Sequence, residues 1–199
     1  MAKTMRAQNL VKPSADSLAA SASAAAKGGL PPVERWNPPF CGDIDMRIAR
    51  DGTWFYQGTP IGRPALVRLF STILWREGER YFLVTPVEKV GITVDDAPFV
   101  AVDCTAEGEG EDMRLTFVTQ TGDVVPAGPE HPIRVERDAG TGEPSPYVLV
   151  RRNLEALIDR KTFYRLVDLG RHAERDGVRW FGLWSDGVFF PVIPSAELG

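Results

Sequence analysis

Cysteine and histidine are scarce in this chain of 199 residues, which holds two of each. The cysteines, Cys41 and Cys104, form no C-x-x-C pair, so the sequence offers neither the spacing of a structural zinc site nor a framework of disulfides. We therefore expect no metal and no cofactor. So little cysteine suits a reducing, cytoplasmic environment.

Long apolar runs and an excess of positive charge are also missing. No segment approaches the roughly 18 apolar residues of a membrane-spanning helix, and the alanine-rich start lacks the continuous apolar core of a signal peptide. The formal net charge is -4, whereas binding to phosphate polymers needs clustered cations. We expect neither a membrane nor a nucleic acid polymer as a partner.

Sequence motifs of catalysis are absent as well. The chain has no G-x-S-x-G element and no phosphate-binding G-x-x-x-x-G-K-[ST] loop, and the run that starts at Gly108 lacks the third glycine of a dinucleotide fingerprint. His131 and His172 accompany no recognisable nucleophile. The aspartates do not follow the spacing of an EF-hand loop. An enzyme is therefore the less favoured interpretation.

Composition divides the chain into three parts. Residues 1–30 are mostly alanine, serine and small polar residues, which bury too little apolar surface to offset the entropy of ordering. We predict a flexible tail there. We further predict an N-terminal half over residues 31–96 and a C-terminal half over residues 97–199.

Apolar periodicity in the first half predicts a hairpin, a helix and two strands. Ile44, Met46 and Ile48 alternate before Asp51-Gly52, a pair typical of a two-residue primed turn. Pro64 suits the first turn of a helix. Apolar residues then recur at helical spacing as far as Leu74, which predicts a helix that ends by Gly78. The predicted strands follow at residues 80–86 and 90–94.

The second half repeats this pattern. Strands are predicted at residues 99–102, 113–119, 133–135 and 146–150, followed by a helix from Lys161 to Ala173 and a strand at residues 179–184. Residues 67–70 align with residues 164–167, and residues 78–83 with residues 177–182. The sequence therefore predicts an α+β fold built as two related halves, each a unit of one helix and antiparallel strands.

Several motifs together resemble an uncharacterised bacterial family, the domain of unknown function 1285. They are Gly42-Asp43-Ile44-Asp45, Asp51-Gly52-Thr53-Trp54, Gly58-Thr59-Pro60-Ile61, Tyr81 to Lys89, His131 to Glu136 and Trp184-Ser185-Asp186-Gly187. The resemblance implies a duplicated α+β architecture, a second half superficially like a pleckstrin-homology fold, and a ligand site between the halves. It also implies a nucleotide-like ligand and a signalling role.

Cations and their neighbours are the candidates for such a site, because an anionic ligand needs donors. The candidate ligand-binding residues are Arg63, Arg68, Thr85, Glu88, Lys89, Arg134, Arg151 and Arg165. Arg68 could instead pair with Glu88, and the Glu88-Lys89 turn could simply be solvated. We predict a sensor or regulator that binds a small anionic or nucleotide-like ligand between its halves.

Two other functions remain open from the sequence. One is a small hydrolase or transferase that acts on a phosphorylated or nucleotide substrate with Asp103 or Glu88 as base. The other is a protein-interaction module in which strands near Trp54 and Trp180 expose an apolar patch to a partner.

Overall fold

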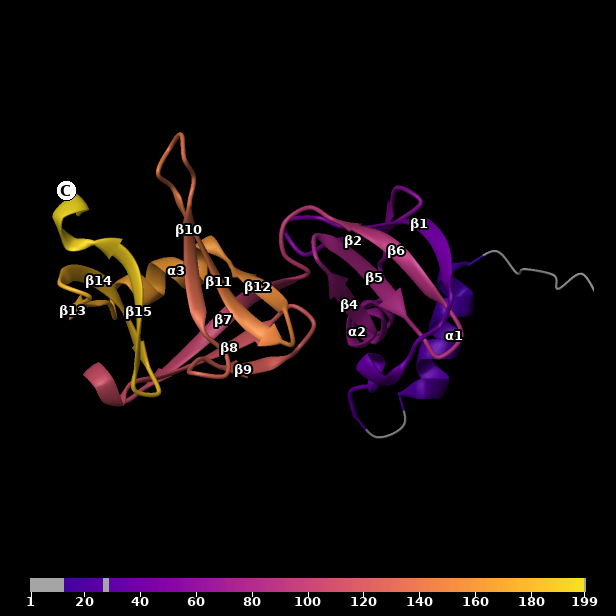
Figure 1. The fold of residues 1–199 in the computed structure, drawn as a ribbon, viewed down its shortest axis with the longest axis horizontal. Helices are drawn as coiled ribbons and strands as arrows, with labels where there is room; N and C mark the ends of the chain where they lie inside the picture. Colours follow the sequence, from indigo (N-terminus) through magenta and orange to yellow (C-terminus); the bar gives the residue numbers. More distant parts are fainter. Residues whose placement is uncertain (1–12, 27–28, 199) are drawn as a thin grey trace, which may run out of the picture.

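Three antiparallel or mixed sheets follow one another along the chain in the computed structural model, which describes residues 13–26 and 29–198 (Figure 1). The first sheet consists of β1 (Phe40–Ile48), β2 (Trp54–Tyr56), β3 (Thr59–Pro60), β4 (Leu74–Glu77), β5 (Arg80–Val84) and β6 (Lys89–Val94). Its order is β3-β2-β1-β6-β5-β4, with the helix α2 (Pro64–Thr72) between β3 and β4 in the chain. The first and last strands, β1 and β6, pair in parallel.

The second sheet repeats this topology. It consists of β7 (Phe99–Glu107), β8 (Arg114–Thr119), β9 (Val124–Pro126), β10 (Ile133–Arg137), β11 (Pro144–Arg151) and β12 (Leu154–Ile158) in the order β10-β11-β12-β7-β8-β9. Again the first and last strands, β7 and β12, pair in parallel. Equivalent bonds follow the last strand of each sheet: Asp95 N–H donates to Ile48 O and Asp159 N–H to Ala101 O, both at 3.0 Å. The mixed α and β content and the two related halves are confirmed.

The alignment that we predicted between the halves is wrong. Matching α2 with the later helix α3 (Arg160–Val167) requires both to hold the same place in the repeat. However, α2 lies between the third and fourth strands of its sheet, whereas α3 follows the sixth strand of the second sheet. The repeat therefore relates β1–β6 to β7–β12, and the second copy has no helix between β9 and β10.

A three-stranded sheet completes the chain and packs against the second sheet. It consists of β13 (Arg171–Arg175), β14 (Val178–Ser185) and β15 (Val188–Pro194), followed by the short helix η3 (Ser195–Glu197). The fully buried Ser185 joins the two sheets, because its hydroxyl accepts from Leu115 N–H at 2.9 Å and donates to Ala127 O at 2.7 Å. Ala127 follows β9, at the place in the chain where the first repeat continues into α2.

The turn between β1 and β2 differs from the predicted two-residue primed turn. Ala49 N–H donates to Thr53 O and Gly52 N–H to Ala49 O, which leaves three residues in the loop. Gly52 has a φ of 85°, and Asp51 is not among the residues with positive φ. This is a type I turn followed by a left-handed glycine, the usual three-residue alternative. The hairpin itself, with Met46 opposite Tyr56, is confirmed.

Both predicted helices are shorter than expected. The start of α2 at Pro64 is confirmed, but the helix ends at Thr72 because Leu74 pairs with Leu83 as part of β4. The second helix ends at Val167, and the segment from Arg171 forms β13. In both cases the predicted end of the helix is wrong, because the apolar residues there suit a helix and a strand equally well. Pairing in the sheet makes these residues part of a strand. No helix in the described residues is long and apolar enough to cross a membrane.

Part of the predicted flexible tail is helical. The helix α1 (Ala15–Ala25) begins with a capping box, in which Ser14 and Ser17 each accept from the other's backbone N–H. Leu18 and Ala22 are fully buried on this helix, and α1 packs against α2. The rest of the predicted tail, residues 1–12 and 27–28, lies outside the described residues.

Replacing Leu18 with alanine is expected to detach α1, because Leu18 is the largest apolar side chain that the helix buries. A leucine-to-alanine substitution in a core lowers the free energy of unfolding by at least about 2 kcal/mol. Here the loss cannot exceed the free energy with which α1 docks, because the helix can detach without unfolding the rest of the protein. Hydrogen exchange measured by mass spectrometry should show fast exchange over residues 15–25 in the variant and protection in the wild type. Equal exchange in both proteins would contradict the docked helix.

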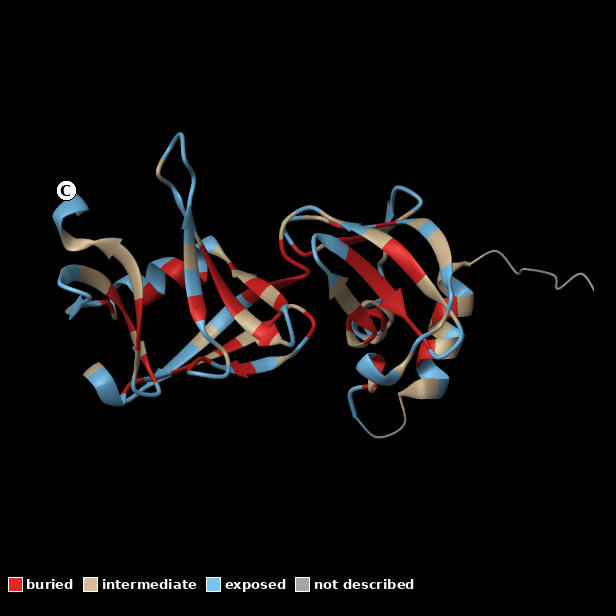
Figure 2. Ribbon diagram, viewed as in Figure 1, coloured by how far each residue is buried: buried red, intermediate tan, exposed pale blue. Residues whose placement is uncertain are grey.

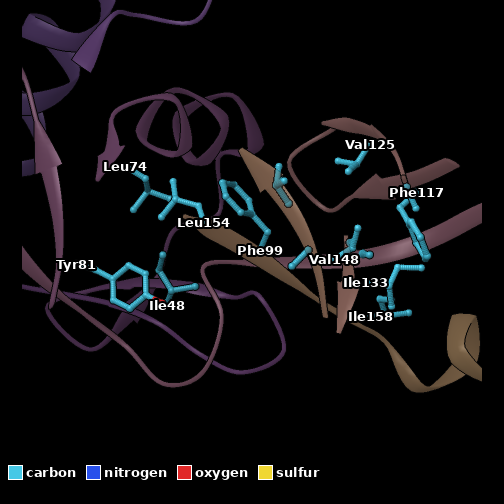
Figure 3. Packing of buried hydrophobic residues seen from close by; sticks show 14 of the residues in the cluster. Ile48, Leu74, Tyr81, Phe99, Phe117, Val125, Ile133, Val148, Leu154 and Ile158 are labelled. Atoms are coloured by element: carbon cyan, nitrogen blue, oxygen red, sulfur yellow. The ribbon is translucent and has the colours of Figure 1, made fainter. Parts of the chain in front are cut away.

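The buried side chains of the two halves form one apolar cluster (Figures 2 and 3). Leu74 and Tyr81 of the first half and Phe99 and Leu154 of the second belong to it and lie between the sheets in Figure 3. Apolar packing therefore continues from one half into the other.

Candidate functional site

A cleft of about 700 Å³ lies between the halves, where α2 faces the turn between β8 and β9. Residues from three segments line it: Gly52, Thr53 and Trp54; Ile61, Gly62, Pro64, Ala65, Val67 and Arg68; and Gln120, Thr121 and Gly122. Small ligands often bind in crevices of this size between packed units. The cleft is therefore the candidate site.

Arg68 is the cation of this cleft, and α2 places it there. Phe70 faces the core with no exposed surface, so Arg68, two positions earlier on the helix, projects away from the first sheet. Its Nε donates to Thr121 O across the interface at 2.9 Å. The guanidinium lies over Gly122, where a Cβ would overlap it, and Gly122 has a φ of 86°. Glycine is thus required beneath the arginine.

Two other lining residues of the cleft each hold a buried donor without a partner. These donors are Nε1 of Trp54 and Nε2 of Gln120, which make no hydrogen bond within the described residues. The orientation of the Gln120 amide is fixed, because its Oε1 accepts from Val100 N–H at 2.7 Å. An unpaired buried donor costs roughly 1–3 kcal/mol, so both groups favour an incoming acceptor.

The β1–β2 turn covers one of these donors. A Cβ at Gly52 would lie 3.0 Å from Gln120 Nε2, so the turn of the first half rests directly on a side chain of the second. Trp54, which follows this turn, is only 2% exposed and stacks on Phe70. The prediction of an exposed apolar patch around Trp54 is therefore wrong, whereas Trp180 is half-buried.

A second arginine, Arg151, binds the β8–β9 turn, to which Arg68 also bonds. Arg151 Nη1 lies 2.5 Å from Asp123 Oδ1, and its Nη2 donates to Ser71 O at 2.7 Å. Its guanidinium also stacks over Phe99, 4.7 Å from the ring centre. Arg151 therefore joins the last turn of α2 to the β8–β9 turn, and with Arg68 it fixes both edges of the contact.

The environment of Asp123 keeps it ionised. Burial raises the pKa of Asp123. The charge of Arg151 and the hydroxyls of Thr119 and Thr121 lower this pKa by a larger amount, so the net shift is downward. Burial lowers the pKa of Arg151 below its ordinary value, against the opposing effect of Asp123. At neutral pH the two groups form a charged pair that is mostly shielded from water.

Three candidates from the β5–β6 region lie elsewhere. Thr85 is fully buried, and its hydroxyl accepts from Glu88 N–H at 3.1 Å, which stabilises the turn. Burial raises the pKa of Glu88, and a hydrogen bond with Ser17 of α1 opposes that shift. Lys89 donates to both oxygens of Glu77 at 2.7 Å. Arg68 does not pair with Glu88, because its partner is Thr121.

The remaining three candidates are separate from the cleft. Arg63 precedes α2 and lines a hollow beside α1. Arg134 binds Glu155 and Glu136 and stacks over Tyr147, in a polar hollow of about 270 Å³ at the junction of the halves. Arg165 pairs with the exposed Asp103. Of the eight candidates, the structure brings only Arg68 and Arg151 to the same turn.

Groups for catalysis do not converge in the described residues. The hydrogen bond with Arg165 lowers the pKa of Asp103, and burial raises the pKa of Cys104 to about 12. His172 Nδ1 lies 2.7 Å from Ser195 Oγ, but this surface pair has no carboxylate bonded to the histidine in the described part of the chain. That part of the chain contains no group of three or more acidic, histidine or cysteine residues that could hold a metal ion.

Sequence reasoning missed Trp54 and Gln120 as site residues. Trp54 follows a turn and belongs to a strand, which indicates core packing, and Gln120 has no distinguishing pattern around it. Their unpaired nitrogens become visible only once the two halves are packed together. The Thr121-Gly122 pair was a usable signal, because a turn of this kind permits close approach of another side chain.

Comparison with known proteins gives two family models and two solved structures. A model described as the N-terminal domain of DUF1285, a domain of unknown function, matches residues 31–97, and one described as the C-terminal domain matches residues 98–192. A crystal structure of a DUF1285 family protein from Silicibacter pomeroyi DSS-3 is 65% identical, with a TM-score of 0.82, over 91% of this chain and 97% of that one. Another, from Shewanella baltica OS155, is 28% identical, with a TM-score of 0.50, over 63% and 91% respectively. No curated protein matches significantly.

Proposed function

The chain belongs to the DUF1285 family, and from the geometry of its cleft we propose that it binds a small anionic ligand between its halves and acts as a sensor or regulator. The observation that carries this proposal is that the lining of one cleft at the interface contains Arg68 and two residues with unpaired buried donors, Trp54 Nε1 and Gln120 Nε2. Donors that lack acceptors in the free protein are expected to gain them from a ligand.

The same contacts link ligand binding to the packing of the two halves. Arg68 bonds to Thr121 across the interface, and the β1–β2 turn rests on Gln120. Gln120 Nε2 lies under this turn, so an acceptor reaches it only when the turn shifts. Ligand binding and the packing of the halves are therefore coupled, as in a population shift between two arrangements. A signalling role of this kind does not depend on a pleckstrin-homology likeness of the second half, which stays a prediction.

Binding without turnover is favoured over hydrolysis or group transfer. The two proposed bases, Asp103 and Glu88, belong to different halves and do not line the cleft. Asp103 is held by Arg165, and Glu88 contacts Ser17. We therefore propose a binding protein as the main function and expect no product when a bound compound is incubated with it.

A thermal-shift screen tests the proposal, since a ligand that binds only the native state raises the melting temperature by mass action. The panel contains nucleotides, cyclic dinucleotides, nucleotide-sugars, phosphorylated metabolites and carboxylates. We expect a dose-dependent rise for at least one anion, which is lost in Arg68→Gln and kept in Arg63→Gln. Arg63 is the matched control, because it flanks the same helix but lies outside the cleft. A panel without any Arg68-dependent shift would overturn the proposed function.

A further inference from the structure

We propose that the ligand of this cleft is a small monocarboxylate with a compact apolar body, rather than a nucleotide or another polyphosphate. This inference rests on the proposed function and names the chemical class of the ligand. Three properties of the lining support it: its charge, its surplus of donors and its apolar wall.

The charge of the lining is a single positive one. Arg68 is the one charged side chain among the lining residues, and Asp123 beside it is already neutralised by Arg151. One guanidinium balances one carboxylate, whereas a di- or triphosphate would bring additional negative charges without cations to meet them. The lining therefore suits an anion of charge near -1.

The polar side chains proposed to meet the ligand offer donors, and those of Trp54 and Gln120 are buried in the free protein. Within the described residues, Arg68 uses only its Nε, which leaves two terminal nitrogens in the parallel arrangement that a carboxylate accepts. Trp54 Nε1 is a donor only, and Gln120 offers its NH₂ because its oxygen is occupied by Val100. A ribose or a base would also present hydroxyl or amino donors, for which the free side-chain acceptors of the lining are the hydroxyls of Thr53 and Thr121, whereas a carboxylate presents acceptors alone.

The wall formed by α2 and the loop before it is apolar around Arg68. Ile61, Pro64, Ala65 and Val67 come from the loop before α2 and from its first turns, and no acidic or amide side chain interrupts them. A volume of about 700 Å³ admits a ligand with several carbon atoms. The geometry thus favours a carboxylate head at Arg68 and an apolar body along the first turn of the same helix.

Hexanoate, hexanamide, inorganic phosphate and AMP distinguish this inference from its competitors. Thermal shift and tryptophan fluorescence are measured for each compound on the full chain. We expect hexanoate to raise the melting temperature and to change the fluorescence, because Trp54 lies in the lining. Hexanamide has the same body without the charge, so its affinity should be at least about tenfold lower.

Substitutions of single residues test which side chains contact hexanoate. Arg68→Gln should weaken hexanoate binding by about tenfold to a hundredfold, and Trp54→Phe, which keeps an aromatic core residue but removes the donor, by several-fold. Arg63→Gln should bind as the wild type does. Circular dichroism of each variant establishes that it is folded, and isothermal titration calorimetry gives the affinities.

The outcomes separate the two proposals. Arg68-dependent binding of AMP or phosphate without binding of hexanoate would overturn the monocarboxylate inference and leave the proposed function standing. Equal affinity for hexanamide and hexanoate would also overturn it, because the charge would then contribute nothing. Failure of every anion to bind through Arg68 would overturn both.

Discussion

Replacing Arg151 with alanine is expected to lower the free energy of unfolding by about 3–5 kcal/mol. The variant leaves Asp123 half-buried without its cation, leaves Ser71 O without its donor and removes the stacking over Phe99. Breaking one partner of a shielded ion pair is far more damaging than the pair itself is stabilising, because the remaining charge stays desolvated. Urea denaturation measures the loss directly.

Arg165→Ala is the matched control for this variant. Arg165 also pairs with an aspartate, but both side chains are about half exposed, so the expected loss is at most about 1 kcal/mol. Similar losses in the two variants would show that the Arg151 contact is no more than a surface ion pair.

The pH dependence of the same pair has a definite sign. Because the net shift lowers the folded-state pKa of Asp123, the pair stabilises the fold fully above the unfolded carboxyl pKa, near 3.9. The contribution is lost as the pH falls through the folded-state pKa. In Arg151→Ala only burial and the threonine hydroxyls act on Asp123, so its pKa rises. The difference in the free energy of unfolding between the wild type and the variant therefore shrinks at acid pH. A constant difference down to pH 2 would contradict this account.

Gly182→Ala is expected to destabilise the C-terminal half by about 3 kcal/mol or more. A Cβ at position 182 would overlap the carbonyl oxygen of Phe190 and lie 2.7 Å from the ring of Phe189. Since a backbone atom blocks the space, β14 and β15 must separate, and the bonds of Ser185 to the second sheet are strained with them.

Gly62→Ala provides the comparison for this substitution. A Cβ at Gly62 meets nothing within 4 Å, and its φ is not in the left-handed range, so the stability should change by no more than about 0.5 kcal/mol. Thermal unfolding of the three proteins checks both values. An unchanged melting temperature for Gly182→Ala would mean that the two strands can move apart at little cost.

Local patterns predicted the elements of this fold better than their ends. Pro64 marks the start of α2 because a helix needs no N–H at its first turn. Leu74 continues the helical spacing, yet it belongs to β4, since pairing with Leu83 in the sheet outweighs local periodicity. Similarly, the segment beyond Val167 leaves the helix and pairs with β14. Duplication was visible in the sequence, but its alignment was not, because similar helix-and-strand segments occupy different places in the two topologies.

Only the charged residues of the candidate site were predicted from the sequence. Arg68 and Arg151 were found because anion binding calls for arginine, but the same reasoning also selected Lys89 and Arg134, which are bound to neighbouring carboxylates. Trp54 and Gln120 could not be found, since a missing partner is a property of the packed interface and not of the local sequence.

The parallel pairing of first and last strands has a consequence for how the chain is made. During synthesis β1 must wait for β6 before its second edge is paired, and β7 must wait for β12. Such distant pairing slows folding, and an unpaired edge is a site of aggregation until it is covered. We therefore expect the first half to fold only after residue 94 has left the ribosome, and the second only after residue 158, in two successive steps of biogenesis.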